Sequence, residues 1–474
     1  MAIIRQLFRQ DRNPTRPLNE IVNTEQALDV RSEIDEYVFT DHTREYLRTL
    51  VDALLDTAQG QKPDVLCGWI AGFFGSGKSH FLKLAAAALE NRPLDRVADG
   101  VGAFEYLVQR HELKIPHERI CREFRVRSIM VNLALALGGG KREGERQLLH
   151  RLEGEIYRGW GLSRVPHVAA IEREIKATGK WETLLDLVRK RNEGADERDE
   201  QGVPLEWTDA RVRDLASEAH RILEDVLPKV LHKYTNVRDY LRDREAVQAS
   251  PEEVVKLAVE LARSLDPELG RVLLCVDEIA LYLKGSASST FDGDRVREVQ
   301  GLAELVKDKG QGRVFLLATA QLRVDDIDAK LTDLKDHVLF LHDRFPKAGR
   351  LELDPRDIDE VVRERWLQKD ERSPHLQGLR QLFAEHGGLL ASVAKLREIA
   401  LLRDDDQLTD EKALVAYYPL LPYHVRLLQE ILSALRHDDQ VGHVAAQNRA
   451  ILADVRQLFA APGGLADAPL GELA

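Results

Sequence analysis

Four short runs of almost uninterrupted apolar residues stand out along the chain, at 65–71, 125–135, 271–278 and 313–320. A run of this kind, without polar alternation, is typical of a strand buried on both faces of a parallel sheet. The last two runs flank a helical pattern, and strand, helix, strand is the order of a parallel α/β unit. We therefore expect an α/β fold with a three-layer core around a parallel sheet.

Helical periodicity fills most of the remaining chain. Before the first strand, apolar residues recur on one helix face at positions 46, 47, 50, 51, 54 and 55. The pattern is helical and highly charged at about 139–269, and helical again from Asp354 onward. Asp354 and Pro355 suit a helix start, because an acidic cap and a proline in the first turn are both favourable there.

These patterns divide the chain into three parts. Residues 1–60 form a leader with an amphipathic helix, 61–353 an α/β core with a helical insertion at about 139–269, and 354–474 a helical lid domain. The length of 474 residues agrees with several domains, because single cores stop growing at about 250–300 residues.

Composition narrows the class of protein. Hydrophobic residues at 44% and charged residues at 31% indicate a globular chain. A net charge of -12 gives no overall basic surface for nucleic acid, although a local basic groove would still allow DNA as a partner. The start of the chain lacks the apolar segment of a secretion signal, and no stretch reaches the roughly 20 apolar residues of a membrane helix. We expect a cytoplasmic protein that does not enter a membrane.

The strongest chemical motif is the octapeptide GFFGSGKS, which matches G-x-x-x-x-G-K-[ST] between a predicted strand and a predicted helix. Its glycines let successive backbone N–H groups face a polyphosphate at the helix N-terminus. Lys78 would then reach the β- and γ-phosphates of ATP, and Ser79 would place its hydroxyl on Mg²⁺. The nucleotide-binding candidates are Gly72, Phe73, Phe74, Gly75, Ser76, Gly77, Lys78 and Ser79.

A second motif, VLLCVDE, ends a buried strand in two carboxylates. Asp277 would support the Mg²⁺ ion, which makes Ser79 and Asp277 the metal candidates. Glu278 would orient or deprotonate the attacking water. Two acids after a strand also occur at ordinary loops, but together with a phosphate-binding loop they favour hydrolysis.

Three further residues are weighed for catalysis. Thr319 ends the strand in RVFLLATAQ, where its hydroxyl could sense the γ-phosphate, although threonine is common in strands without any role. Arg344 in HDRF could neutralise transition-state charge on a neighbouring subunit, or simply pair with a surface acid. His80 follows Ser79 and is better explained by packing than as a catalytic base.

The motifs GFFGSGKS, LLCVDE, LLATAQ and HDRF occur in the order seen in the AAA+ and related P-loop ATPases, which the chain resembles. Within that group, YVFTDHTREYLRTLVDALL, GWIAGFFGSGKSHFLKL and YYPLLPYHVRLLQEIL are similar to the large P-loop ATPases of bacterial BREX phage-defence systems, the BrxC or PglY family. Members of that family run longer, so the resemblance implies that this chain corresponds to their N-terminal end.

The resemblance implies an ATPase with the cofactors ATP and Mg²⁺, acting as a homo-oligomer if Arg344 works in trans. It also implies phage-defence partners, namely a DNA methyltransferase and a PglZ-type phosphatase-like protein. Two alternatives stay open. One is a nucleotide-gated scaffold with little turnover, and the other is an ATP-driven DNA translocase, which would require a basic channel.

Overall fold

The computed structural model describes residues 3–9, 30–72, 76–94, 101–133, 147–194, 198, 203, 205–242, 249–284, 291–331, 341–353, 355–393, 410–424, 427, 457–461 and 463–469. Phe73, Phe74, Gly75 and Asp354, which the sequence analysis singles out, lie outside these residues. So do 139–146 of the predicted insertion.

The chain forms an α/β fold around a five-stranded sheet with the strand order β2-β3-β4-β1-β5. All four neighbouring strand pairs are parallel. The strands are β1 (Cys67–Gly72), β2 (Arg125–Asn132), β3 (Gly270–Asp277), β4 (Val314–Ala320) and β5 (Arg350–Leu353). Every residue of β3 and β4 is buried, as expected for central strands covered by helices on both faces.

The sequence predicts the first four strands to within three residues at each end. The second differs most, because its ladder with β3 ends at Asn132 rather than at residue 135. The fifth strand, β5, is missing from the prediction. It is only four residues long, and its burial alternates because Arg350 and Glu352 are partly or fully exposed, so it carries no continuous apolar run.

Helices pack on both sides of the sheet. On one side α3 contacts the sheet and is itself covered by α1 and α4, and on the other side α6, α12 and α14 pack against the sheet, with α12 in contact with both α6 and α14. Helix α2 lies along β5. The bounds are α1 (Val30–Glu36), α2 (Asp41–Ala58), α3 (Lys78–Leu89), α4 (Ala103–Arg110), α5 (Glu118–Glu123), α6 (Gln147–Gly159), α12 (Pro251–Leu265), α13 (Ile279–Lys284), α14 (Gly293–Lys309) and α15 (Val324–Leu331).

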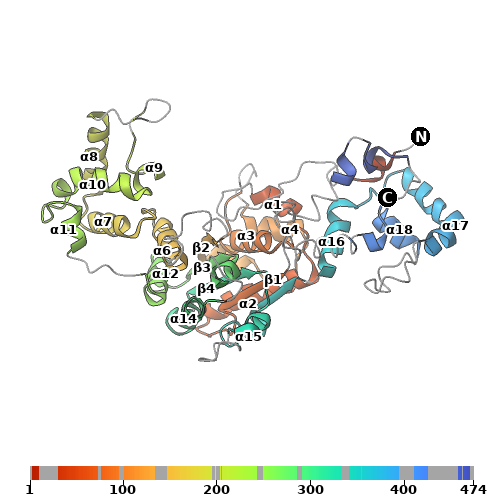
Figure 1. Cartoon of the computed structure of the whole chain (residues 1–474), viewed down its shortest axis with the longest axis horizontal. Coiled ribbons are helices and arrows are strands. Elements are labelled where there is room, and N and C mark those ends of the chain that lie inside the picture. The colour runs from red at the N-terminus through yellow and green to blue at the C-terminus, as the bar shows by residue number, and fades with distance from the viewer. Residues whose placement is uncertain are drawn as a thin grey trace.

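A second hydrophobic core lies within the helical stretch between β2 and β3. All described regular elements there are helices: besides α6 and α12, they are α7 (Pro166–Ala177), α8 (Trp181–Gly194), α9 (Ala210–Arg213), α10 (Ala216–Val230) and α11 (Val237–Arg242). Helices α7 to α11 gather around buried residues such as Trp207, Leu223 and Tyr240. Figure 1 shows this group at one end of the molecule, whereas α6 and α12 belong to the core of the sheet.

A third core lies at the opposite end of the molecule (Figure 1) and contains both termini of the described chain. Ile4 and Leu7 of the 3-10 helix η1 (Ile4–Leu7) pack there with Trp366 and Leu379. The other elements of this part are α16 (Pro355–Trp366), α17 (His375–Val393), α18 (Glu411–Tyr417) and η7 (Leu465–Asp467), and η5 (Lys347–Gly349) precedes β5. Described residues of the segment 1–60 therefore contribute to two cores.

Candidate functional site

The site begins where β1 ends and α3 starts. Gly77 caps α3 with φ of 91°, in the left-handed region that glycine adopts without strain. A Cβ atom on Gly72 would lie 2.7 Å from Ser76 Oγ, so glycine also suits this position. Lys78 and Ser79 are the first two residues of α3, and the side chain of Lys78 is buried, with Lys78 only 4% exposed.

Asp277, the last residue of β3, accepts hydrogen bonds on both carboxylate oxygens. Ser79 Oγ donates to Asp277 Oδ1 over 2.9 Å, and Thr319 Oγ1 donates to the same oxygen over 2.6 Å. Asn132 Nδ2 donates to Asp277 Oδ2 over 3.1 Å. The donors come from α3, β4 and β2, because the carboxyl ends of parallel strands meet at one edge of the sheet.

Glu278 stands directly beside this carboxylate in an unusual backbone conformation. Its φ of 59° is rare for a residue with a side chain, and its N–H donates to Thr319 Oγ1 over 3.0 Å. Strained residues of this kind often occur at functional sites, where surrounding contacts hold them. Here Thr319 supplies such a contact to Glu278 and to Asp277 at once.

The Glu278 carboxyl is also electrostatically perturbed. Burial raises its pKa above the ordinary value, and the charge of Asp277 raises it further. The opposing influence is mainly the positive charge of Lys78. Gln321 Nε2 donates to Glu278 Oε2 over a long 3.5 Å. The carboxyl therefore holds a proton more readily than an exposed glutamate does.

The arrangement fits a polyphosphate with a divalent cation. Ser76 Oγ is buried and has no hydrogen-bond partner among the described atoms, so it could donate to an additional acceptor. Lys78 provides a buried positive charge beside the glycine turn. Ser79 and Asp277 place a hydroxyl and a carboxylate oxygen 2.9 Å apart, and such hard oxygen ligands are those that Mg²⁺ prefers.

Arg344 does not lie with these residues. Its guanidinium forms a salt bridge of 3.0 Å with Glu304 of α14. Its neighbour Phe345 packs edge-on against Trp69 of β1, with ring centroids 5.1 Å apart. In the β-ladder between β1 and β5, Trp69 lies opposite Arg350, the first residue of β5. The described side-chain contact of Arg344 therefore joins it to α14 and not to Asp277 or Glu278.

His80 has a packing environment. Its ring meets Tyr37 edge-on at 5.0 Å, and burial, with a smaller contribution from Arg365, lowers the pKa of His80 to about 3. A neutral imidazole in this position is a poor proton acceptor at pH 7. His80 is accordingly not part of the group around Asp277.

Two residues of the site are absent from the sequence interpretation. Asn132 contacts Asp277 directly, and Arg151 of α6 donates from Nη1 to the Asn132 carbonyl oxygen over 2.7 Å. The sequence signal for Asn132 is its polar side chain within the otherwise apolar end of the predicted strand 125–135. Its importance becomes visible only when β2 pairs with β3 and brings Asn132 opposite Asp277.

No family model matches the chain. Across the part of the chain that the structure describes, there is also no helix with the length and apolar character to cross a membrane.

Proposed function

We propose that this chain is an AAA+-type P-loop ATPase, which binds ATP at the carboxyl edge of the sheet and hydrolyses it to ADP and phosphate. The observation that carries the proposal is the convergence on Asp277 of Ser79, Thr319 and Asn132. That convergence places the last residue of the motif GFFGSGKS against the first acid of VLLCVDE. The five-stranded parallel sheet with helices on both sides is compatible with a P-loop core.

Each residue of the site has a role in this proposal. The glycine turn and the N-terminus of α3 hold the phosphates, and Lys78 neutralises their charge. Ser79 and Asp277 would hold Mg²⁺, which neutralises charge that develops on the phosphate oxygens during transfer. Glu278 orients the attacking water and accepts its proton, which its raised pKa favours. Thr319 and Asn132 keep the two acids in position.

The wider biological role follows from the resemblance to the BrxC or PglY family. We place the ATPase in a bacterial phage-resistance complex with a DNA methyltransferase and a PglZ-type protein, in which hydrolysis powers or gates action on DNA. The support is the similarity of the quoted sequence motifs. The net charge of -12 means that DNA contact requires a local basic surface or a partner protein.

The test is steady-state ATP hydrolysis by the full chain, alone and with duplex DNA or defence proteins. Lys78→Ala and Glu278→Gln should each lower turnover by about 10²-fold or more, and the Glu278→Gln variant should still bind ATP. The matched control is Glu268→Gln, because Glu268 is exposed and precedes the opposite end of the same strand. Tight ATP binding by the wild type without turnover under any condition would replace the ATPase with a nucleotide-gated scaffold.

A further inference from the structure

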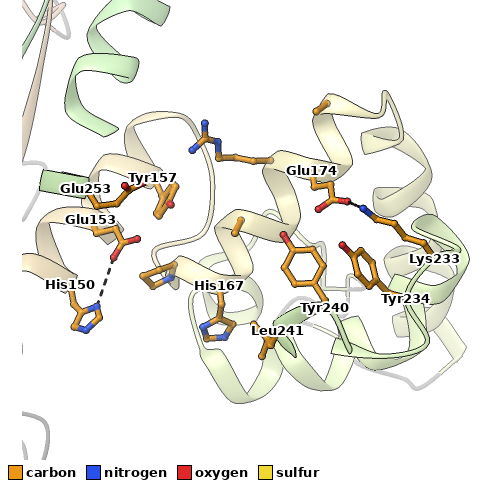
Figure 2. A pocket seen from close by; sticks show the side chains of 14 residues that line it. His150, Glu153, Tyr157, His167, Glu174, Lys233, Tyr234, Tyr240, Leu241 and Glu253 are labelled. Carbon is orange, nitrogen blue, oxygen red and sulfur yellow. Dashed lines mark ion pairs between the residues drawn. The ribbon is translucent and has the colours of Figure 1, made fainter. Parts of the chain in front are cut away.

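A cavity of about 1010 Å³ lies between the sheet core and the helical group α7–α11. It is lined from α6 and α12 on one side, and from α7, α11 and the segment leading into α11 on the other. Figure 2 shows Glu153 and Glu253 at one end and Tyr234, Tyr240 and Lys233 at the other. The nucleotide site uses none of its lining residues.

Aromatic rings form much of the cavity wall. Tyr157, Tyr234 and Tyr240 all line it, and all three side chains belong to buried residues. Tyr234 and Tyr240 meet edge-on with their ring centroids 4.9 Å apart. Such rings offer flat apolar surface to a hydrocarbon stem and a negative face to a cation.

The two strong bases of the cavity wall are already engaged. Lys233 Nζ lies 2.6 Å from Glu174 Oε1, so this pair is neutral as a whole. Arg173 forms a salt bridge of 3.0 Å with Glu260, which does not line the cavity. The Arg173 guanidinium also stacks on Trp160, 4.9 Å from the ring centroid.

Glu153 is the unusual group in this cavity. It is only 6% exposed, yet among the described residues no lysine or arginine lies within salt-bridge distance of it. Its nearest basic atom is His150 Nδ1, at 3.8 Å. Burial raises the pKa of Glu153 to about 7, and the facing Glu253 of α12 contributes to the shift. The Glu253 carboxylate accepts a long contact of 3.4 Å from Lys256 Nζ.

We propose that this cavity binds a ligand with an ammonium or guanidinium group on an apolar stem, its charge against Glu153 and Glu253 and its stem against Tyr157 and Tyr240. A buried carboxylate without a strong base gains most when a cation enters, because the pair compensates the loss of water around both groups. The tyrosine rings add cation–π attraction and apolar contact. The ligand is either a free small molecule or an arginine or lysine side chain of a partner protein.

Binding to the full chain is measured by isothermal titration calorimetry with three probes. Butylguanidinium carries the charge, butylurea has the same stem without it, and a short glycine–serine peptide with one central arginine represents a partner. Butylguanidinium, the peptide or both should bind saturably, and butylurea should bind about tenfold more weakly or not at all. Binding by the peptide alone would identify a protein partner, and binding by butylguanidinium alone would identify a small molecule.

Two variants test the position of the charge. Glu153→Gln and Glu253→Gln keep the shape of the side chain, and each should weaken binding by about tenfold or more. The matched control is Glu252→Gln, since Glu252 is the neighbour of Glu253 but is exposed and pairs with Lys309. Thermal unfolding checks that the variants remain folded. The proposal is overturned if neither cationic probe binds the wild type, if butylurea binds equally well, or if both variants bind like the control.

Discussion

At the scale of single residues, the site depends on one side chain that serves both acids. The Thr319 hydroxyl donates to Asp277 Oδ1 and accepts the N–H of Glu278. Both contacts are buried or nearly so, and Thr319 itself is completely buried. Besides the γ-phosphate sensing predicted from the sequence, this hydroxyl has a positional role, because it fixes Asp277 relative to Glu278.

This double contact predicts a specific outcome for Thr319→Val. Valine keeps the shape of the side chain but removes the hydroxyl, which leaves the Glu278 N–H without its acceptor at a cost of about 1–3 kcal/mol. We expect ATP turnover to fall by about tenfold or more, whereas ATP affinity changes little. Thr319→Ser retains the hydroxyl and should recover most of the turnover. Equal turnover in wild type and Thr319→Val would contradict the positioning role.

At the scale of elements, the first four strands were predictable and the short edge strand β5 was not. Strands β3 and β4 lie between helical layers, so every position is apolar or buried and the sequence run is unmistakable. Strand β5 is short and alternates, which is the pattern of many loops. The contact between Asn132 and Asp277 could not be predicted either, because it depends on which strands become neighbours.

Helix α6 makes a close backbone contact that only glycine permits. A Cβ atom on Gly154 would lie 2.5 Å from the carbonyl oxygen of Arg164, in the segment that leads from α6 into α7. Backbone atoms at this distance cannot move aside as a flexible side chain can. Gly301 of α14 is the contrasting case, because its nearest neighbour would be a Pro251 carbon at 3.9 Å, an ordinary contact.

The two glycines therefore predict opposite effects of the same substitution. Gly154→Ala should destabilise the protein by roughly 1–3 kcal/mol, because the overpacked helix must shift. Gly301→Ala should stabilise it by roughly 0.5–1 kcal/mol, because alanine loses less conformational freedom in a helix interior. Denaturant unfolding followed by circular dichroism compares the two variants with wild type. Stabilisation by Gly154→Ala would show that the helix does not pack so closely against this segment.

At the scale of the whole molecule, the described residues form three hydrophobic cores. Ile4, Leu7 and Phe8 join the C-terminal core, although hundreds of residues separate them from Trp366. The salt bridge between Arg365 of α16 and Glu36 of α1 links that core to the helices beside the sheet. Pairings this distant in sequence leave no local pattern, so periodicity could not have predicted them.

The position of Arg344 bears on how copies of the chain would cooperate. Arg344 pairs with Glu304 of α14, and no described contact joins it to Asp277 or Glu278 of the same subunit. The proposed action of Arg344 on the nucleotide of a neighbouring copy can be tested by mixing subunits.

We expect Arg344→Ala and Lys78→Ala each to lower ATP turnover by about 10²-fold or more, because each removes positive charge from the transferred phosphate. In an equal mixture, an Arg344→Ala subunit retains Lys78 and can receive the arginine of a Lys78→Ala neighbour. Random assembly should then restore turnover to about a quarter of the wild-type value. The control mixture replaces Arg344→Ala with Arg344→Ala/Lys78→Ala, which contains no intact site and should stay inactive. An inactive test mixture, with subunit exchange confirmed by fluorescence transfer, would restrict Arg344 to its salt bridge with Glu304.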